Sequence, residues 1–197
     1  MSVQTGTKRK EGGFAETVRV VFHALIIALV IRTFLFQPFN IPSGSMIPTL
    51  LVGDYLFVSK YSYGYTHYSL PFSPPLFSGR VFGSQPQRGD VVVFRLPKDD
   101  SVDYIKRVIG LPGDHIRIVY GHVYVNDEQL SEPYVPSDYL DARSYSDIVV
   151  PNNSYFVLGD HRSMSNDSRE FGPVMRSYIY GKAVLGYWPM EKLGILH

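Results

Sequence analysis

One apolar segment near the amino terminus, Val18 to Phe36, constrains this chain more than any other feature. Only Arg19, His23, Arg32 and Thr33 interrupt its apolar character. As a helix rising about 1.5 Å per residue, it would extend roughly 28 Å and nearly match the hydrocarbon core of a bilayer. The arginines lie near its ends, where long side chains can carry charge to the interface. A buried helix of a soluble domain is the alternative, but length and flanks favour a transmembrane helix.

Charges around this segment predict its orientation. Lys8, Arg9 and Lys10 precede it, whereas residues 33–53 carry no charge, so the positive-inside rule places the amino terminus in the cytoplasm. A cleaved signal peptide would also begin with a basic patch and an apolar run, but residues 33–37 lack the small residues that a cleavage site needs. We therefore predict an uncleaved anchor. The expected organisation is a cytoplasmic tail over 1–16, a transmembrane helix over 17–37 and an extracytoplasmic domain over 38–197.

Beyond the anchor, short runs rich in β-branched and aromatic residues alternate with Gly, Pro and Asp. This pattern is typical of strands separated by turns, and Tyr120-Gly121 predicts a tight hairpin. We expect a mainly β, antiparallel domain, either a partly closed barrel or a pair of packed sheets. Residues 130–151 show no periodicity and are interpreted as a surface excursion. The predicted strands are 55–58, 90–96, 104–109, 115–120, 122–126, 154–158 and 182–188.

An aromatic segment, residues 61–82, needs a separate interpretation because its prolines and glycine oppose a long strand or helix. Tyrosine and phenylalanine favour the headgroup zone of a bilayer, so the segment could contact the membrane. The rings could equally cover a thin β core. Its aromatic residues are Tyr61, Tyr63, Tyr65, Tyr68, Phe72, Phe77 and Phe82.

Composition narrows the chemistry. The 197 residues suffice for one ordinary globular domain, and a net charge of +1 without a long basic run argues against a nucleic-acid partner. Cysteine is absent, so a nucleophile must be an oxygen or an amine. Metal-binding and nucleotide-binding motifs are also absent from the sequence, and we expect neither a metal nor another cofactor.

Residues 42–50, Pro-Ser-Gly-Ser-Met-Ile-Pro-Thr-Leu, contain a candidate nucleophile. Pro42 and Pro48 could brace Ser45 in a rigid turn with free backbone N–H groups beside it. A serine in such a turn is most often only a turn residue, so catalysis needs a base. None of the six histidines lies in a setting that pairs it convincingly with Ser45 and an acid.

Lys106 is the better candidate base. In a strand it shares a face with Tyr104 and Val108. If that face is buried, desolvation would lower the lysine pKa from about 10.4 to about 8, and the neutral amine could take a hydroxyl proton. The pattern does not settle which face is buried, because Ile105 and Ile109 lie on the other one. On this motif alone a surface lysine is the commoner outcome.

A third segment, residues 159–169, follows a predicted strand and carries charges of both signs. It could be any solvated loop, or a hydrogen-bonded loop that fixes one geometry. Together with the anchor, residues 42–50 and residues 104–114, it resembles bacterial type I signal peptidases, membrane-bound serine peptidases that remove signal peptides from exported proteins. The resemblance extends from the anchor to about Trp188. It implies a plasma-membrane protein with its catalytic domain on the outer face.

The resemblance implies roles for residues around the predicted site. Ser45 would be the nucleophile and Lys106 the general base, while the Ser43 hydroxyl and the Ser45 backbone N–H would form the oxyanion hole. Ser165 would orient the lysine amine. Met46 would line a shallow pocket for a small substrate side chain, although it could equally serve packing. The implied substrates are signal peptides of exported preproteins, bound as an added strand at the lipid surface.

Two ion pairs are also implied by the resemblance, Asp167 with Arg169 and Asp160 with Arg107. The chain departs from the family pattern at His161, where asparagine is common, and in having one anchor where some members have two. Two rival classes stay open. A self-cleaving repressor with a related β core would need a DNA-binding amino-terminal domain, and a non-catalytic anchored β module that binds peptides or lipid would need no reactive serine.

Overall fold

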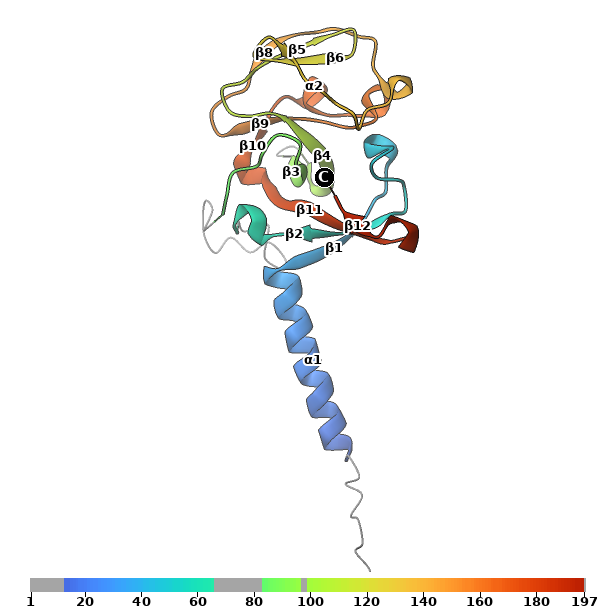
Figure 1. The fold of residues 1–197 in the computed structure, drawn as a ribbon. Coiled ribbons are helices and arrows are strands. Elements are labelled where there is room, and N and C mark those ends of the chain that lie inside the picture. Colours follow the sequence, from blue (N-terminus) through green and yellow to red (C-terminus); the bar gives the residue numbers. More distant parts are fainter. Residues whose placement is uncertain (1–12, 66–82, 97–98, 197) are drawn as a thin grey trace, which may run out of the picture.

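The computed structural model describes residues 13–65, 83–96 and 99–196, and consists of one long helix projecting from a β-rich domain (Figure 1). The helix, α1 (Phe14–Phe34), is 21 residues long. Only Thr33 among its residues is buried, so it is not the core helix of a soluble domain in this structure. By length and composition it could cross a membrane.

Helix α1 ends before the predicted boundary of residue 37, because Phe36–Asn40 forms strand β1 instead. Pro38 lies inside this strand. Proline is tolerated there because β1 is an edge strand that pairs only with β2 among the described strands. The chain therefore passes from α1 into the sheet with a single residue, Leu35, between them. The backbone N–H of Lys60 donates to the Leu35 carbonyl at 3.1 Å.

The domain contains two antiparallel sheets, which confirms the predicted mainly β class. The larger has the order β1-β2-β11-β3-β4-β9-β10 with β12 paired to β11, and the smaller has the order β7-β6-β5-β8. Besides β1, the strands are β2 (Tyr55–Ser59), β3 (Val91–Leu96), β4 (Asp99–Gly110), β5 (His115–Val119), β6 (His122–Val125), β7 (Glu128–Gln129), β8 (Tyr145–Val149), β9 (Ser154–Leu158), β10 (Val174–Met175), β11 (Ile179–Trp188) and β12 (Gly194–Ile195). A short helix, α2 (Ser168–Phe171), precedes β10.

All seven predicted strands are present, with ends that differ by a few residues. The predicted hairpin at Tyr120-Gly121 is confirmed, since Val119 pairs with His122 and both turn residues have positive φ, 47° and 82°. The interpretation of residues 130–151 as a surface excursion is incomplete, since no strand was predicted there. Strand β8 lies within it and pairs with β5, but half-buried and exposed residues do not alternate regularly along it, so the sequence carried no strand signal.

The core has a separate apolar cluster on each face of the larger sheet. Val91 and Val93 belong to one cluster, whereas Val92 and Phe94 belong to the other. A third cluster includes residues of both sheets, among them Ile116 of β5 and Phe156 of β9. Strand β4 is therefore covered on both sides over the part where the candidate site lies.

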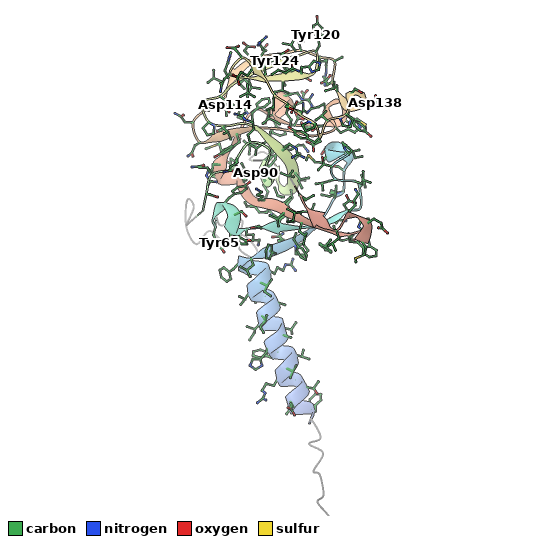
Figure 2. The ribbon with its side chains drawn as sticks, viewed as in Figure 1. Tyr65, Asp90, Asp114, Tyr120, Tyr124 and Asp138 are labelled. Atoms are coloured by element: carbon green, nitrogen blue, oxygen red, sulfur yellow. The ribbon has the colours of Figure 1, made fainter. Side chains whose placement is uncertain are left out.

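The predicted aromatic segment lies mostly outside the described residues, which omit 66–82. Of its described members, Tyr63 is 1% exposed and its hydroxyl donates to Asp90, so this ring covers the core. Tyr65 lies at the junction of α1 and the domain, where its hydroxyl donates to the Phe34 carbonyl (Figure 2). Tyr61 is 49% exposed.

Candidate active site

Ser45 lies in a single 3₁₀ turn, Gly44–Met46, that follows β1. The backbone N–H of Ile47 closes this turn on the Gly44 carbonyl, and that of Leu50 donates to the Met46 carbonyl. Only 8% of Ser45 is exposed. The turn is thus held by its own backbone hydrogen bonds and presents Ser45 at the edge of the core.

Met46 was expected either to line a shallow substrate pocket or to serve packing. Its side chain is 0% exposed and packs in the same cluster as Ile41 and Leu50. Burying this side chain fixes the turn on the sheet, because the residue next to Ser45 is anchored in the core. The packing role that the sequence left open is the one present in this structure.

Lys106 approaches Ser45 from the middle of β4. Its Nζ lies 2.6 Å from Ser45 Oγ and 2.8 Å from the Ile105 carbonyl oxygen, and the residue is 3% exposed. Both faces of β4 are buried here, since Ile105 and Val108 belong to clusters on opposite sides. The Lys106 amine is therefore buried, and the alternative that Lys106 is an ordinary surface lysine is wrong.

Burial changes the chemistry of this amine. Desolvation lowers the pKa of Lys106 from 10.5 to about 8, although the nearby carboxylates of Asp167 and Asp160 act in the opposite direction. A lysine with this pKa is neutral in about a tenth of the molecules at pH 7 and in about half of them at pH 8. The pair of Ser45 and Lys106, hereafter the dyad, can therefore pass a proton from oxygen to nitrogen.

The 159–169 loop packs directly against the backbone of Ser45. The N–H of His161 donates to the Ser45 carbonyl at 3.1 Å, and the N–H of Gly159 donates to Asp167. A methyl group on Gly159 would lie 2.4 Å from the Ser45 carbonyl oxygen and 2.2 Å from Ser165 Oγ. Only glycine leaves room for this approach.

Both predicted ion pairs are present as contacts. Arg107 meets Asp160 with two hydrogen bonds, of 2.9 and 2.7 Å, and Arg169 meets Asp167 at 2.8 Å. All four side chains are at most 3% exposed. Thr49 adds a further hydrogen bond to Asp160 from the far end of the serine segment. Breaking a buried pair by removing one partner typically costs about 3–5 kcal/mol, so these pairs hold the loop in one arrangement.

Two predicted site residues, Ser165 and Ser43, and the family-variant position His161 also lie near the dyad. Ser165 Oγ is buried but forms no hydrogen bond within the described part of the chain, including none to Lys106. Ser43 is exposed and precedes the turn. The His161 ring packs 4.4 Å from the Tyr139 ring, between centroids, and thus belongs to a contact with the excursion.

Two acidic residues of the 130–151 excursion contact the 159–169 loop and were not predicted from the sequence. Glu132 forms an ion pair with Arg162, and Asp141 accepts from Arg169 at 2.8 Å. The ring of Tyr134 covers the Arg107 guanidinium at 4.0 Å. No motif in the sequence signals these contacts, because they join segments whose proximity depends on the tertiary fold.

Comparison with known proteins gives one consistent result. Residues 14–188 match the family model described as signal peptidase, peptidase S26. Signal peptidase I of Rickettsia typhi is 43% identical, with 81% of this chain and 74% of that protein aligned. Signal peptidase I of Rickettsia conorii is 41% identical over 82% of this chain and 72% of that protein. A crystal structure of a signal peptidase I from Enterococcus faecalis is 33% identical and covers 50% of this chain and 97% of that one; its TM-score of 0.44 supports no argument.

Proposed function

The chain belongs to the signal peptidase family, peptidase S26, and we propose that it is a membrane-anchored serine endopeptidase that cleaves signal peptides with Ser45 as nucleophile and Lys106 as general base. One observation carries the assignment of the dyad. The two reactive atoms lie 2.6 Å apart inside a site that keeps both side chains almost fully out of water.

The proposed reaction uses one amine for every proton transfer. Neutral Lys106 takes the Ser45 proton while Oγ attacks the scissile carbonyl carbon. As the carbon–nitrogen bond breaks, the ammonium returns this proton to the leaving amine. A water then attacks the acyl-enzyme and gives its proton to Lys106, which passes it to Ser45 Oγ as the ester breaks.

Residues around the dyad have supporting roles in this proposal. The Ser45 backbone N–H and the Ser43 hydroxyl stabilise the negative oxygen of the tetrahedral intermediate. The family resemblance assigns the orientation of the amine to Ser165, whose buried Oγ has no other hydrogen-bond partner in the described part of the chain. The pairs of Arg107 with Asp160 and Arg169 with Asp167 keep the 159–169 loop against the serine.

An extended substrate fits the sheet. Strand β4 pairs with β9 only from Arg107 onward, so Asp103 to Lys106 pair on one side alone among the described strands. Strand β1, which leads into the Ser45 turn, is likewise an edge. We assign these open strand edges to a signal peptide of an exported preprotein, bound as an added strand beside the dyad.

The membrane arrangement is part of the proposal. Helix α1 is the anchor, the basic residues Lys8 to Lys10 place the amino terminus in the cytoplasm, and the domain after residue 35 lies on the outer face of the plasma membrane. Two neighbouring segments, 51–55 and 188–195, lie at the end of the domain from which α1 projects (Figure 1). Both carry large apolar side chains that are exposed. They are Leu51, Val52, Tyr55, Trp188, Met190, Leu193 and Ile195. We assign this apolar surface to contact with lipid.

A precursor cleavage assay tests the function. The purified full chain in detergent should cut an exported precursor after an Ala-X-Ala site, and Ser45→Ala and Lys106→Ala should each lower the rate at least about 1,000-fold, because each removes half of a unit that acts together. Folding of both variants is checked by circular dichroism. An intact precursor after incubation with the unmodified chain would favour the non-catalytic β module, and cleavage retained by Lys106→Ala would refute the dyad.

A further inference from the structure

We propose that Glu132, in the excursion between β7 and β8, is a positioning residue for the dyad and acts through Arg162. The inference rests on the proposed function and assigns a task to a segment outside the motifs shared with the family. Its basis is a continuous path of contacts from the Glu132 carboxylate to the backbone of Ser45.

The first contact on this path is a buried, two-armed ion pair. One guanidinium nitrogen of Arg162 donates to Glu132 Oε2 at 2.9 Å, and the other donates to Oε1. The Arg162 side chain is 2% exposed and that of Glu132 is 9% exposed. Because a buried guanidinium cannot give up its charge, Arg162 depends on this carboxylate to stay where it is.

The second contact leads from Arg162 to the loop behind the serine. Its Nε donates to the Gly159 carbonyl at 3.0 Å. Two residues further on, the N–H of His161 donates to the Ser45 carbonyl. Gly159 also lies so close to that carbonyl that no side chain fits between them. A displacement of the Gly159 carbonyl would therefore be transmitted to Ser45, whose Oγ must stay within reach of Lys106.

Tyr134 holds the same arrangement from the other side. Its hydroxyl donates to Glu132 Oε1 at 3.0 Å, and its ring covers the guanidinium of Arg107, which binds Asp160. The excursion thus contacts both Arg107, which binds Asp160, and Arg162, which lies two residues after it. The Tyr134 hydroxyl fixes the carboxylate, and the carboxylate fixes Arg162.

The central variant is Glu132→Gln, which keeps the shape of the side chain and removes its charge. With the full chain in detergent and a peptide substrate, we expect kcat to fall 10-fold to 100-fold and KM to stay within twofold, because the substrate strand binds elsewhere. Glu128→Gln is the matched control. It makes the same chemical change on an exposed side chain four residues earlier and should leave kcat within twofold.

A double-mutant cycle separates positioning through Arg162 from a general loss of stability. If Glu132 acts through Arg162, adding Glu132→Gln to Arg162→Gln should slow kcat less than twofold beyond Arg162→Gln alone. Multiplied losses in the double variant would overturn the inference. So would a Glu132→Gln variant with the kcat of the unmodified chain.

Each outcome of this experiment has one meaning. If Glu132→Gln is unfolded at the assay temperature, Tyr134→Phe replaces it, since this change removes only the hydroxyl that holds the carboxylate. We expect Tyr134→Phe to lower kcat at least threefold, and an unchanged kcat would overturn the inference. An unmodified chain that does not cleave would refute the proposed function and this inference with it, whereas an active chain that is indifferent to Glu132 refutes the inference alone.

Discussion

At the scale of single residues, the account depends on the solvation of one amine. Lys106 is 3% exposed, and desolvation lowers its pKa to about 8, although the carboxylates of Asp167 and Asp160 raise it. The cost of ionising a buried amine is what makes it a base near neutral pH, because the same group in water would be protonated.

The pH dependence of cleavage follows from this pKa. Below about pH 8 the amine binds a proton in the folded protein and cannot take one from Ser45, so kcat/KM should rise about tenfold per pH unit and level off above pH 8. Initial rates from pH 6 to pH 10 with a substrate that has no titratable side chain would measure it. A profile that is flat across this range would contradict the role of Lys106.

The sequence identified Lys106 as a candidate but not its burial. Alternation along a strand separates two faces, and it distinguishes core from solvent only when one face is polar. Here the neighbours on both faces, Val108 on one and Ile105 and Ile109 on the other, are apolar, and the structure buries both. Ser165 shows the limit at this scale, since its sequence position implied a hydrogen bond to the lysine that is absent from the described contacts.

At the scale of elements, the 159–169 loop brings distant segments together. It touches the serine turn through His161, strand β4 through Asp160, and the excursion through Arg162. The close approach of Gly159 to the Ser45 carbonyl makes this loop and the serine turn one rigid unit.

A single methyl group should disrupt this unit. In Gly159→Ala the new Cβ would lie 2.4 Å from the Ser45 carbonyl oxygen, so the two backbones must separate by about 1 Å, and we expect kcat to fall at least about 100-fold. Gly194→Ala is the control, because a methyl group there meets no atom within 4 Å. Steady-state kinetics of both variants measure the effect, and near-normal turnover by Gly159→Ala would show that the contact does not matter.

Elements with a clear local pattern were predictable, and elements that depend on partners were not. The strand 154–158 is observed at its predicted bounds, and the hairpin at Tyr120-Gly121 follows from its turn chemistry. Strand β1 was missed because its Phe and Pro residues continue the preceding apolar run, so that its first residues were assigned to the end of the predicted transmembrane helix. Strand β8 was missed because half-buried and exposed residues do not alternate regularly along it.

At the scale of the whole molecule, helix α1 and the sheet would position the proposed dyad relative to the membrane. Helix α1 passes into edge strand β1 with a single residue, Leu35, between them, and β1 leads to the Ser45 turn (Figure 1). The long apolar helix was predictable from hydropathy, although it runs over Phe14–Phe34 and not over 17–37. The strand order was not, because β11 lies between β2 and β3, and such long-range pairing has no local signature.

The apolar surface around β12 gives a test of how the domain sits on lipid. The only tryptophan of the chain, Trp188, is 54% exposed within that surface. In vesicles containing the full chain, we expect lipids brominated on their acyl chains to quench its fluorescence, since the ring would lie at the interface. Unquenched emission that remains fully accessible to aqueous iodide would place this surface in water and refute the lipid contact.

The most direct test of the central claim is a titration of the Lys106 amine itself. The full chain with ¹³C-labelled lysine in detergent gives one Cε signal per lysine, and the signal lost in Lys106→Arg identifies the relevant one. The account predicts that its chemical shift changes with a midpoint near pH 8. A midpoint near the ordinary value of 10.5 would leave only about one amine in 3,000 neutral at pH 7, against about one in ten for a pKa of 8, and would contradict the role of Lys106 as the base.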